Sequence, residues 1–152
     1  MAYIEWQDDY ATGIKVIDGQ HLRIIEYING LDDARHSGNQ EAVAETLANL
    51  VDYTLSHFAF EESLMQDVGY AAFSVHVQTH DSFRERIAGY QSAFRDGQDV
   101  TEELLELLGV WLFEHIAKDD QSYVPAVKVR FPELTQSADS GWLRQKIAKF
   151  FG

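Results

Sequence analysis

Residues 73–94 read FSVHVQTHDSFRERIAGYQSAF, a run without proline in which large side chains recur at alternating steps of three and four. The recurring positions are Phe73, His76, His80, Phe83, Ile87, Tyr90 and Phe94. This spacing places them on one face of an α-helix, and its persistence over three heptads is typical of the seam of a left-handed helix bundle. The sequence therefore predicts a long helix here, with two histidines on its buried face.

Three more stripes of this kind precede Pro125, and breaker-rich segments at 35–39, 67–69 and 96–99 separate the helices. Their inner faces are, in chain order, His21, Ile24 or Ile25, Ile28 and Leu31; Leu47, Leu50, Thr54, His57, Glu61 and Leu64 or Met65; and Leu105, Leu108, Leu112 and His115. The alternation that marks strands is absent. Four long helices joined by short loops predict an all-α fold, an antiparallel up-down-up-down four-helix bundle.

Two helix starts are indicated by their capping residues. Asp18 is a good N-cap for the first helix. Asp99, with Glu102 three residues later, has the pattern of a capping box in front of the fourth helix. We therefore expect these helices to begin at Asp18 and near Asp99.

The bundle is expected to span residues 18–125, flanked by an N-terminal arm at 1–17 and a C-terminal extension at 126–152. Residues 141–151 predict a short amphipathic helix in this extension. Its apolar face is expected to contain Leu143, Ile147, Phe150 and Phe151. This face serves either to dock a protein partner or a membrane surface, or to pack on the acidic bundle or on another copy. We favour packing, because three basic residues make a weak membrane anchor.

Composition narrows the classes of function. A chain of 152 residues is long enough for one domain with a real core. Its net charge of −13 disfavours nucleic acid as a partner. The absence of cysteine excludes disulfides, thiolate metal sites and a cysteine nucleophile. With no secretory signal or long apolar run, we expect a cytoplasmic protein. We further expect a monomer or a small homo-oligomer.

Polar residues interrupt the apolar stripes where leucine or isoleucine would be ordinary. These inward positions are His21, His57, Glu61, His76, His80 and His115. Burying each without a partner costs about 1–3 kcal/mol, so something must satisfy them. The four-residue steps within two of the helices suit metal ligation, and Asp119 or Asp120 provides a further carboxylate near the last histidine. Imidazole with carboxylate suits zinc, iron, copper or nickel, and seven ligands fit two ions better than one.

Four segments together resemble the hemerythrins, specifically the bacterial single-domain members, and the resemblance covers about residues 4–125. The segments are Asp18-Gly19-Gln20-His21, His57-Phe58-Ala59-Phe60-Glu61-Glu62, His76-Val77-Gln78-Thr79-His80-Asp81 and His115-Ile116-Ala117-Lys118-Asp119-Asp120. This family has the same bundle fold, and it holds two non-haem iron ions that bind dioxygen. The resemblance therefore implies a di-iron cofactor in this chain.

Carried over residue by residue, the resemblance implies a ligand set for each iron. One iron takes His76, His80 and His115, and the other takes His21 and His57 and keeps an open position. Glu61 and Asp120 bridge both irons, beside a solvent-derived oxo or hydroxo bridge.

Two neighbouring carboxylates compete with the implied bridges. A four-residue step from His115 favours Asp119, but the family's five-residue step favours Asp120, and we attribute that longer step to the helix ending there. Glu61 is preferred over Glu62, which points about 100° away from the face of His57.

The expected function is reversible binding of dioxygen for storage, delivery or buffering, rather than enzymatic catalysis. The residues expected to keep an oxygen pocket dry are Ile24, Phe58, Trp111, Leu112 and Ile116. Two alternatives remain open: a module that senses oxygen, redox state or iron through a partner protein, and a di-iron peroxidase or oxidase.

Overall fold

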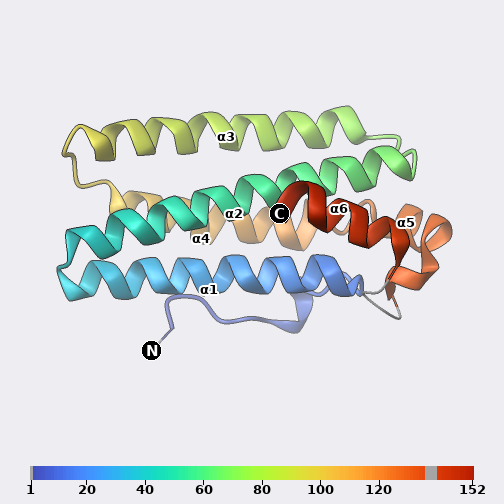
Figure 1. Cartoon of the computed structure of the whole chain (residues 1–152), viewed down its shortest axis with the longest axis horizontal. Helices are drawn as coiled ribbons and strands as arrows, with labels where there is room; N and C mark the ends of the chain where they lie inside the picture. The colour runs from blue at the N-terminus through green and yellow to red at the C-terminus, as the bar shows by residue number, and fades with distance from the viewer. Residues whose placement is uncertain (1, 136–139) are drawn as a thin grey trace.

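A computed structural model describes residues 2–135 and 140–152, and it confirms the all-α four-helix bundle. Its long helices are α1 (Lys15–Ser37), α2 (Gln40–Asp67), α3 (Phe73–Arg95) and α4 (Thr101–Glu114). Figure 1 shows successive helices running in opposite directions along one long axis. The described residues contain no β-strand. Within them, no helix is long and apolar enough to cross a membrane.

The connection between α1 and α2 is a two-residue turn. Gly38 adopts a positive φ of 73°, and its N–H donates to the carbonyl of Arg35. The Asn39 side chain then accepts from the backbone N–H groups of Glu41 and Ala42, which caps α2. A turn this short forces the two helices to lie side by side and antiparallel.

The first predicted helix start differs from the structure, whereas the start predicted near Asp99 is confirmed within two residues, because α4 begins at Thr101. α1 begins at Lys15, so Asp18 lies within its first turn; its carboxylate accepts from the backbone N–H of Thr12 at 2.8 Å and of Gly13 at 3.1 Å. Asp18 therefore fastens the arm to the helix. Before α4 the predicted capping box is wrong, because Val100 is the N-cap residue. The Asp99 side chain accepts only one long hydrogen bond, from the backbone N–H of Thr101 at 3.4 Å.

The core divides into two apolar clusters along the bundle axis. One lies between the long helices and includes Ile28, Leu50 and Leu108. The other lies at the end of the bundle and includes Phe60, Leu64 and residues of the C-terminal extension. The polar residues of interest lie between these clusters, so apolar side chains exclude water from both sides.

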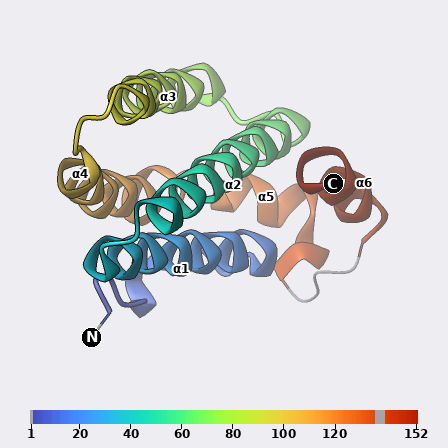
Figure 2. The ribbon, with the colours of Figure 1, turned by 60° about the vertical axis from the view of Figure 1, so that its left-hand side comes forward.

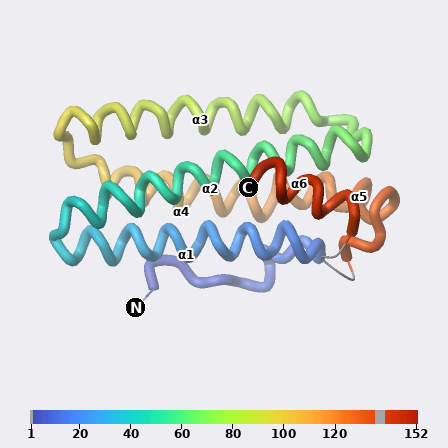
Figure 3. Tube along the Cα trace, in the orientation of Figure 1, coloured from blue at the N-terminus to red at the C-terminus, as the bar shows by residue number. Residues whose placement is uncertain are grey.

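The N-terminal arm runs along α1 and includes the short helical turn η1 (Asp8–Tyr10), as Figure 3 shows. The backbone of Ile4 exchanges two hydrogen bonds with the Asn29 side chain, at 2.8 and 2.9 Å. The ring of Tyr10 stacks on Phe113 with centroids 4.4 Å apart. The arm is thus held against α1 and α4.

Beyond α4 the chain continues without leaving the bundle. The π-helical turn η2 (His115–Asp119) extends α4, and α5 (Val124–Arg130) and η3 (Pro132–Thr135) follow it. Pro125 lies in the first turn of α5 rather than ending a helix, since the first turn needs no N–H donor there. Residues 136–139 of the predicted extension lie outside the described residues.

The predicted amphipathic helix is α6 (Gly141–Phe151), which packs beside α2 (Figure 2). The Trp142 ring meets Phe60 edge to face at 5.7 Å, and its indole N–H donates to Asp67 at 2.7 Å. Ile147, expected on the inner face, is 37% exposed. The other three predicted residues do lie on the inner face, since Leu143 is buried and Phe150 and Phe151 pack against the apolar cluster at the end of the bundle; Trp142 packs there as well. Docking of this helix to a partner or a membrane stays a prediction.

Replacing Trp142 by alanine is expected to lower the free energy of unfolding by about 2 kcal/mol, roughly half the cost for a fully buried tryptophan. Urea unfolding followed by circular dichroism measures the change. Ile147→Ala, on the outer face of the same helix, is the matched control and should cost about 0.5 kcal/mol. Equal losses of unfolding free energy in the two variants would contradict the packing of α6 on α2 through Trp142.

Candidate metal centre

The seven residues predicted as metal ligands come from α1, α2, α3 and the η2 turn that extends α4, and they meet between the two apolar clusters. They are His21 on α1, His57 and Glu61 on α2, His76 and His80 on α3, His115 in η2 and Asp120 directly after it. All are buried, with at most 5% of any residue exposed. Separate turns of separate helices thus converge on one dry space.

The ligand atoms fall into two overlapping groups, in each of which all atoms lie within 4.8 Å of one another. The first group is Glu61, His76, His80, His115 and Asp120, and the second is His21, His57, Glu61 and Asp120. We name them the three-histidine half and the two-histidine half. Because Glu61 and Asp120 belong to both groups, the arrangement fits two ions joined by carboxylates better than one ion.

A widened helical turn decides between Asp119 and Asp120. The N–H of Asp120 donates to the carbonyl of His115 at 2.9 Å, a five-residue step. Asp120 Oδ1 thereby lies 3.0 Å from His115 Nε2, inside the centre. Asp119 turns outward and accepts from His115 Nδ1 at 3.1 Å. The helix ends here, with Asp120 as its C-cap residue. Its last turn is widened into a π-helical turn, a distortion common at functional sites.

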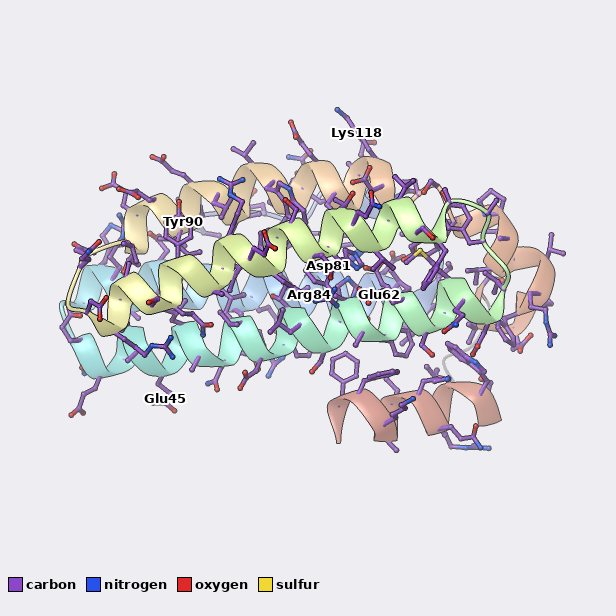
Figure 4. All side chains as sticks on the ribbon, turned by 90° about the horizontal axis from the view of Figure 1, so that it is seen from above. Glu45, Glu62, Asp81, Arg84, Tyr90 and Lys118 are labelled. Atoms are coloured by element: carbon purple, nitrogen blue, oxygen red, sulfur yellow. The ribbon has the colours of Figure 1, made fainter. Side chains whose placement is uncertain are left out.

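On α2, Glu61 likewise lies inside the centre and its neighbour Glu62 lies outside it. Glu61 Oε1 lies 3.2 Å from His57 Nε2 and 3.4 Å from His80 Nε2. Glu62 lies on the neighbouring face, where it accepts from His80 Nδ1 and from Arg84, each at 2.7 Å. Figure 4 shows Glu62 on α2 opposite Arg84 on α3. The 100° step between adjacent residues thus gives one carboxylate to the centre and the next to its surroundings.

The hydrogen bonds around the histidines direct their free nitrogen atoms inward. A carboxylate only accepts, so Nδ1 of His80 and of His115 carries the proton. Their Nε2 atoms then face one another, 2.9 Å apart. Two lone pairs at this distance repel unless a cation lies beside them, which is the environment a metal ion supplies.

Other buried atoms of the centre also lack hydrogen-bond partners among the described residues. They are Nε2 of His21, His57 and His76, Oε1 of Glu61, and both carboxylate oxygens of Asp120. An unsatisfied buried group costs about 1–3 kcal/mol, so this many would strain a domain of ordinary stability. Metal ligation satisfies all of them together, and the residues present therefore fit a metal centre.

The carboxylates are ionised in this setting. Burial and Glu61 raise the pKa of Asp120, but His115 and His21 outweigh them and hold it well below its usual range. Burial also raises the pKa of Glu61, and the surrounding histidines lower it further than burial raises it. Both groups are therefore anionic at neutral pH and suited to bind cations.

The histidines respond to burial and charge in opposite ways. Burial lowers the pKa of His115, but Asp120, Asp119 and Glu61 together raise it well above its usual value. The pKa of His80 is also raised, because Glu61 and Glu62 outweigh its burial. Burial dominates at His57, whose pKa is lowered. Without metal, these carboxylates therefore favour the protonated forms of His80 and His115.

Tyr123 and Gln20 complete the centre, although the sequence analysis gave neither of them a role. The Tyr123 hydroxyl donates to Glu61 Oε2 at 2.6 Å, and burial raises its pKa well above the usual value, so it stays a donor. Gln20 Oε1 accepts from His57 Nδ1 at 2.6 Å. A buried amide directly before His21, on an otherwise apolar stripe, was the available signal for Gln20.

The five residues predicted to line an oxygen pocket all belong to or pack against the apolar cluster between the long helices, and two of them stack on histidines of the centre. Phe58 stacks on the ring of His80 at 4.0 Å, and the half-buried Trp111 stacks on His115 at 5.0 Å. These two rings cover the three-histidine half. The other three, Ile24, Leu112 and Ile116, are fully buried in the core cluster beside the centre.

Comparisons with known proteins agree with this site. The Hemerythrin HHE cation binding domain matches residues 12–127. Bacteriohemerythrins of Pseudomonas aeruginosa and Stenotrophomonas maltophilia are 49% and 45% identical to this chain, each over the full length of both proteins. A crystal structure of wild-type hemerythrin, 33% identical, superposes with a TM-score of 0.79 over 82% of this chain and 98% of the other.

The fold, the buried cluster and these relatives support a di-iron oxygen-binding protein. Since the domain match spans most of the chain and the identity extends over its whole length, this chain belongs to the hemerythrin family.

Proposed function

We propose that this protein binds dioxygen reversibly at two non-haem iron ions, joined by an oxo or hydroxo bridge, and so stores, delivers or buffers dioxygen. The observation that carries the proposal is the pair of overlapping ligand groups that share two buried carboxylates. Five imidazoles and two carboxylates are nitrogen and oxygen donors that suit iron. The family membership favours iron over the other metals that such donors accept.

In this proposal the three-histidine half holds one ion and the two-histidine half holds the other, with Glu61 and Asp120 contacting both. The second ion then has one imidazole fewer, which agrees with an open position for a small ligand. When bound, a ferrous pair supplies the electrons with which dioxygen is held and released. The protein's part is to fix the donors and to control what reaches them.

Control of access depends on the apolar shell. Ile24, Leu112 and Ile116 are buried next to the centre, and we propose that they keep water and acids out of the two-histidine half. Phe58 and Trp111 shield the other half by covering His80 and His115. Tyr123 holds the second oxygen of Glu61 and so limits its rotation. A cytoplasmic location and the oligomeric state stay predictions.

Anaerobic reconstitution with ferrous iron is expected to give about two iron ions per chain, from the count of ligand groups. An optical band should appear on exposure to air, vanish under argon and return over repeated cycles. His21→Leu, which removes one of two imidazoles from the two-histidine half, should lower iron affinity at least tenfold; Glu45→Gln on the exposed face of α2 is the control.

Several results would count against this proposal. A single zinc ion or no metal in the purified protein would exclude the iron pair. Irreversible oxidation at the first exposure to air would exclude storage and delivery. Many turnovers with peroxide and a reductant would indicate the enzymatic alternative, and a partner retained only in one oxygenation state would indicate sensing.

The metal-free protein is expected to lose stability as pH rises above about 6.5, the ordinary histidine pKa. The raised pKa values of His80 and His115 contribute stability that is present below that pH and lost as these groups deprotonate. His57, whose pKa is lowered, opposes this trend only in part.

Metal ions should reverse this dependence, because they bind the deprotonated nitrogens and replace the lost protons. Melting temperatures measured from pH 6 to 9, with iron and after chelation, check the prediction. The difference between the two forms should widen as pH rises. A constant difference would show that the histidines do not exchange protons for metal.

A further inference from the structure

The two halves of the centre differ in what their histidines donate to. In the three-histidine half, Nδ1–H of His80 donates to Glu62 at 2.7 Å and Nδ1–H of His115 donates to Asp119 at 3.1 Å. Both acceptors are carboxylates. Two of the three imidazoles on this side therefore donate to groups that carry negative charge at neutral pH.

In the two-histidine half, the acceptor described for a histidine Nδ1–H is neutral. Nδ1–H of His57 donates to the amide oxygen of Gln20 at 2.6 Å. Nδ1 of His21 is buried and has no hydrogen-bond partner among the described residues. The contrast therefore lies in the charge of the acceptors, since the bond to Gln20 is as short as the bond to Glu62.

Charge on the acceptor changes what an imidazole gives to a metal. A hydrogen bond from the distal N–H to a carboxylate fixes the ring orientation and raises the basicity of the other nitrogen. Such charge-assisted bonds are about twice as strong as neutral ones. A more basic imidazole donates more electron density and stabilises the more oxidised metal ion.

Of the two carboxylates, Glu62 is the better placed to act this way. Its side chain is 21% exposed, against 49% for Asp119, so solvent screens it less. The same oxygen that accepts from His80 also accepts from Arg84 Nη2 at 2.7 Å. Nη1 of Arg84 in turn donates to Asp81 at 2.8 Å, so the guanidinium is held at both ends.

Arg84 also reaches the ring that covers His80. Its guanidinium carbon lies 5.5 Å from the centroid of Phe58, and Phe58 stacks on His80 with an interplanar angle of 12°. One arginine therefore fixes both the acceptor at the edge of His80 and the aromatic ring against its face. Figure 4 shows Glu62, Asp81 and Arg84 grouped between α2 and α3.

We propose that Glu62 is a positioning residue for His80 and that its charge makes the three-histidine half the stronger electron donor of the two. Arg84 holds Glu62 in place, and Gln20 gives His57 the same orientation without the charge. This inference rests on the proposed function, because it concerns the two ions that the centre would hold. By contrast, a solvated Glu–Arg pair contributes little to stability and nothing to a metal.

Two substitutions separate orientation from charge. Glu62→Ala removes the acceptor, and Glu62→Gln keeps an accepting oxygen but removes the charge. Glu45→Gln is the matched control, since it removes the same charge from an exposed site on α2, about 25 Å away along the helix. Asp81→Asn removes a carboxylate from Arg84 while leaving the acceptor of His80.

Titration of the metal-free proteins with Co²⁺ and a competing chelator measures affinity independently of dioxygen binding. The wild-type chain should bind about two ions, and Glu62→Ala should weaken one of them about 10- to 100-fold. Glu62→Gln should change affinity by less than about threefold, because orientation is retained. In the iron-loaded protein, Glu62→Gln should raise the reduction potential, and Gln20→Glu should lower it.

The outcomes distinguish the inference from the proposed function. If the wild-type chain fails to bind two ions, both are overturned. If it binds two ions while Glu62→Ala and Glu62→Gln behave like Glu45→Gln, only the inference is overturned. An equal shift of potential in Glu62→Gln and Asp81→Asn would also overturn it, because charge near the surface would then suffice. Should Glu62→Ala fail to fold, the potential of Glu62→Gln carries the test.

Discussion

The structure depends on one constraint: buried imidazole nitrogens and carboxylate oxygens lie within 4.8 Å of one another in two overlapping groups. His80 and His115 direct Nε2 atoms at each other across 2.9 Å, and both oxygens of Asp120 lack hydrogen bonds among the described residues. Such an arrangement is costly in an apolar interior unless cations compensate it. The bundle therefore supplies a dry frame, and a bound metal would add to its stability.

Packing around the centre holds the imidazole and carboxylate groups in fixed positions. One apolar cluster lies on each side of the centre along the axis, and the rings of Phe58 and Trp111 lie flat against two of the histidines. The π-helical turn at His115 adds one residue to the ordinary repeat and so brings Asp120 inward. A regular α-helix would direct the exposed Asp119 there instead, and the shared carboxylate would be lost.

Most of the fold and most of the centre could be predicted from periodicity. The alternating three- and four-residue steps identified the four helices, and the four-residue pairs His57/Glu61 and His76/His80 identified donors on their inner faces. The choice of Asp120 came from family resemblance, and the structure confirms that the helix ends there, in a π-helical turn that the periodicity does not predict. The start of the first helix was misplaced, because Asp18 bonds to the arm rather than capping its own helix.

What the sequence determined by itself is local: which stretches are helical, which face of each is apolar, and which polar residues interrupt that face. Repeats of three and four residues express these properties directly. Only the tertiary structure decided which groups surround the donors, since Gln20 meets His57 from 37 residues away and Tyr123 meets Glu61 from 62 residues away. It also decided that tryptophan rather than Ile147 faces the bundle in α6. Such choices depend on how separate helices pack, and no short-range pattern records that.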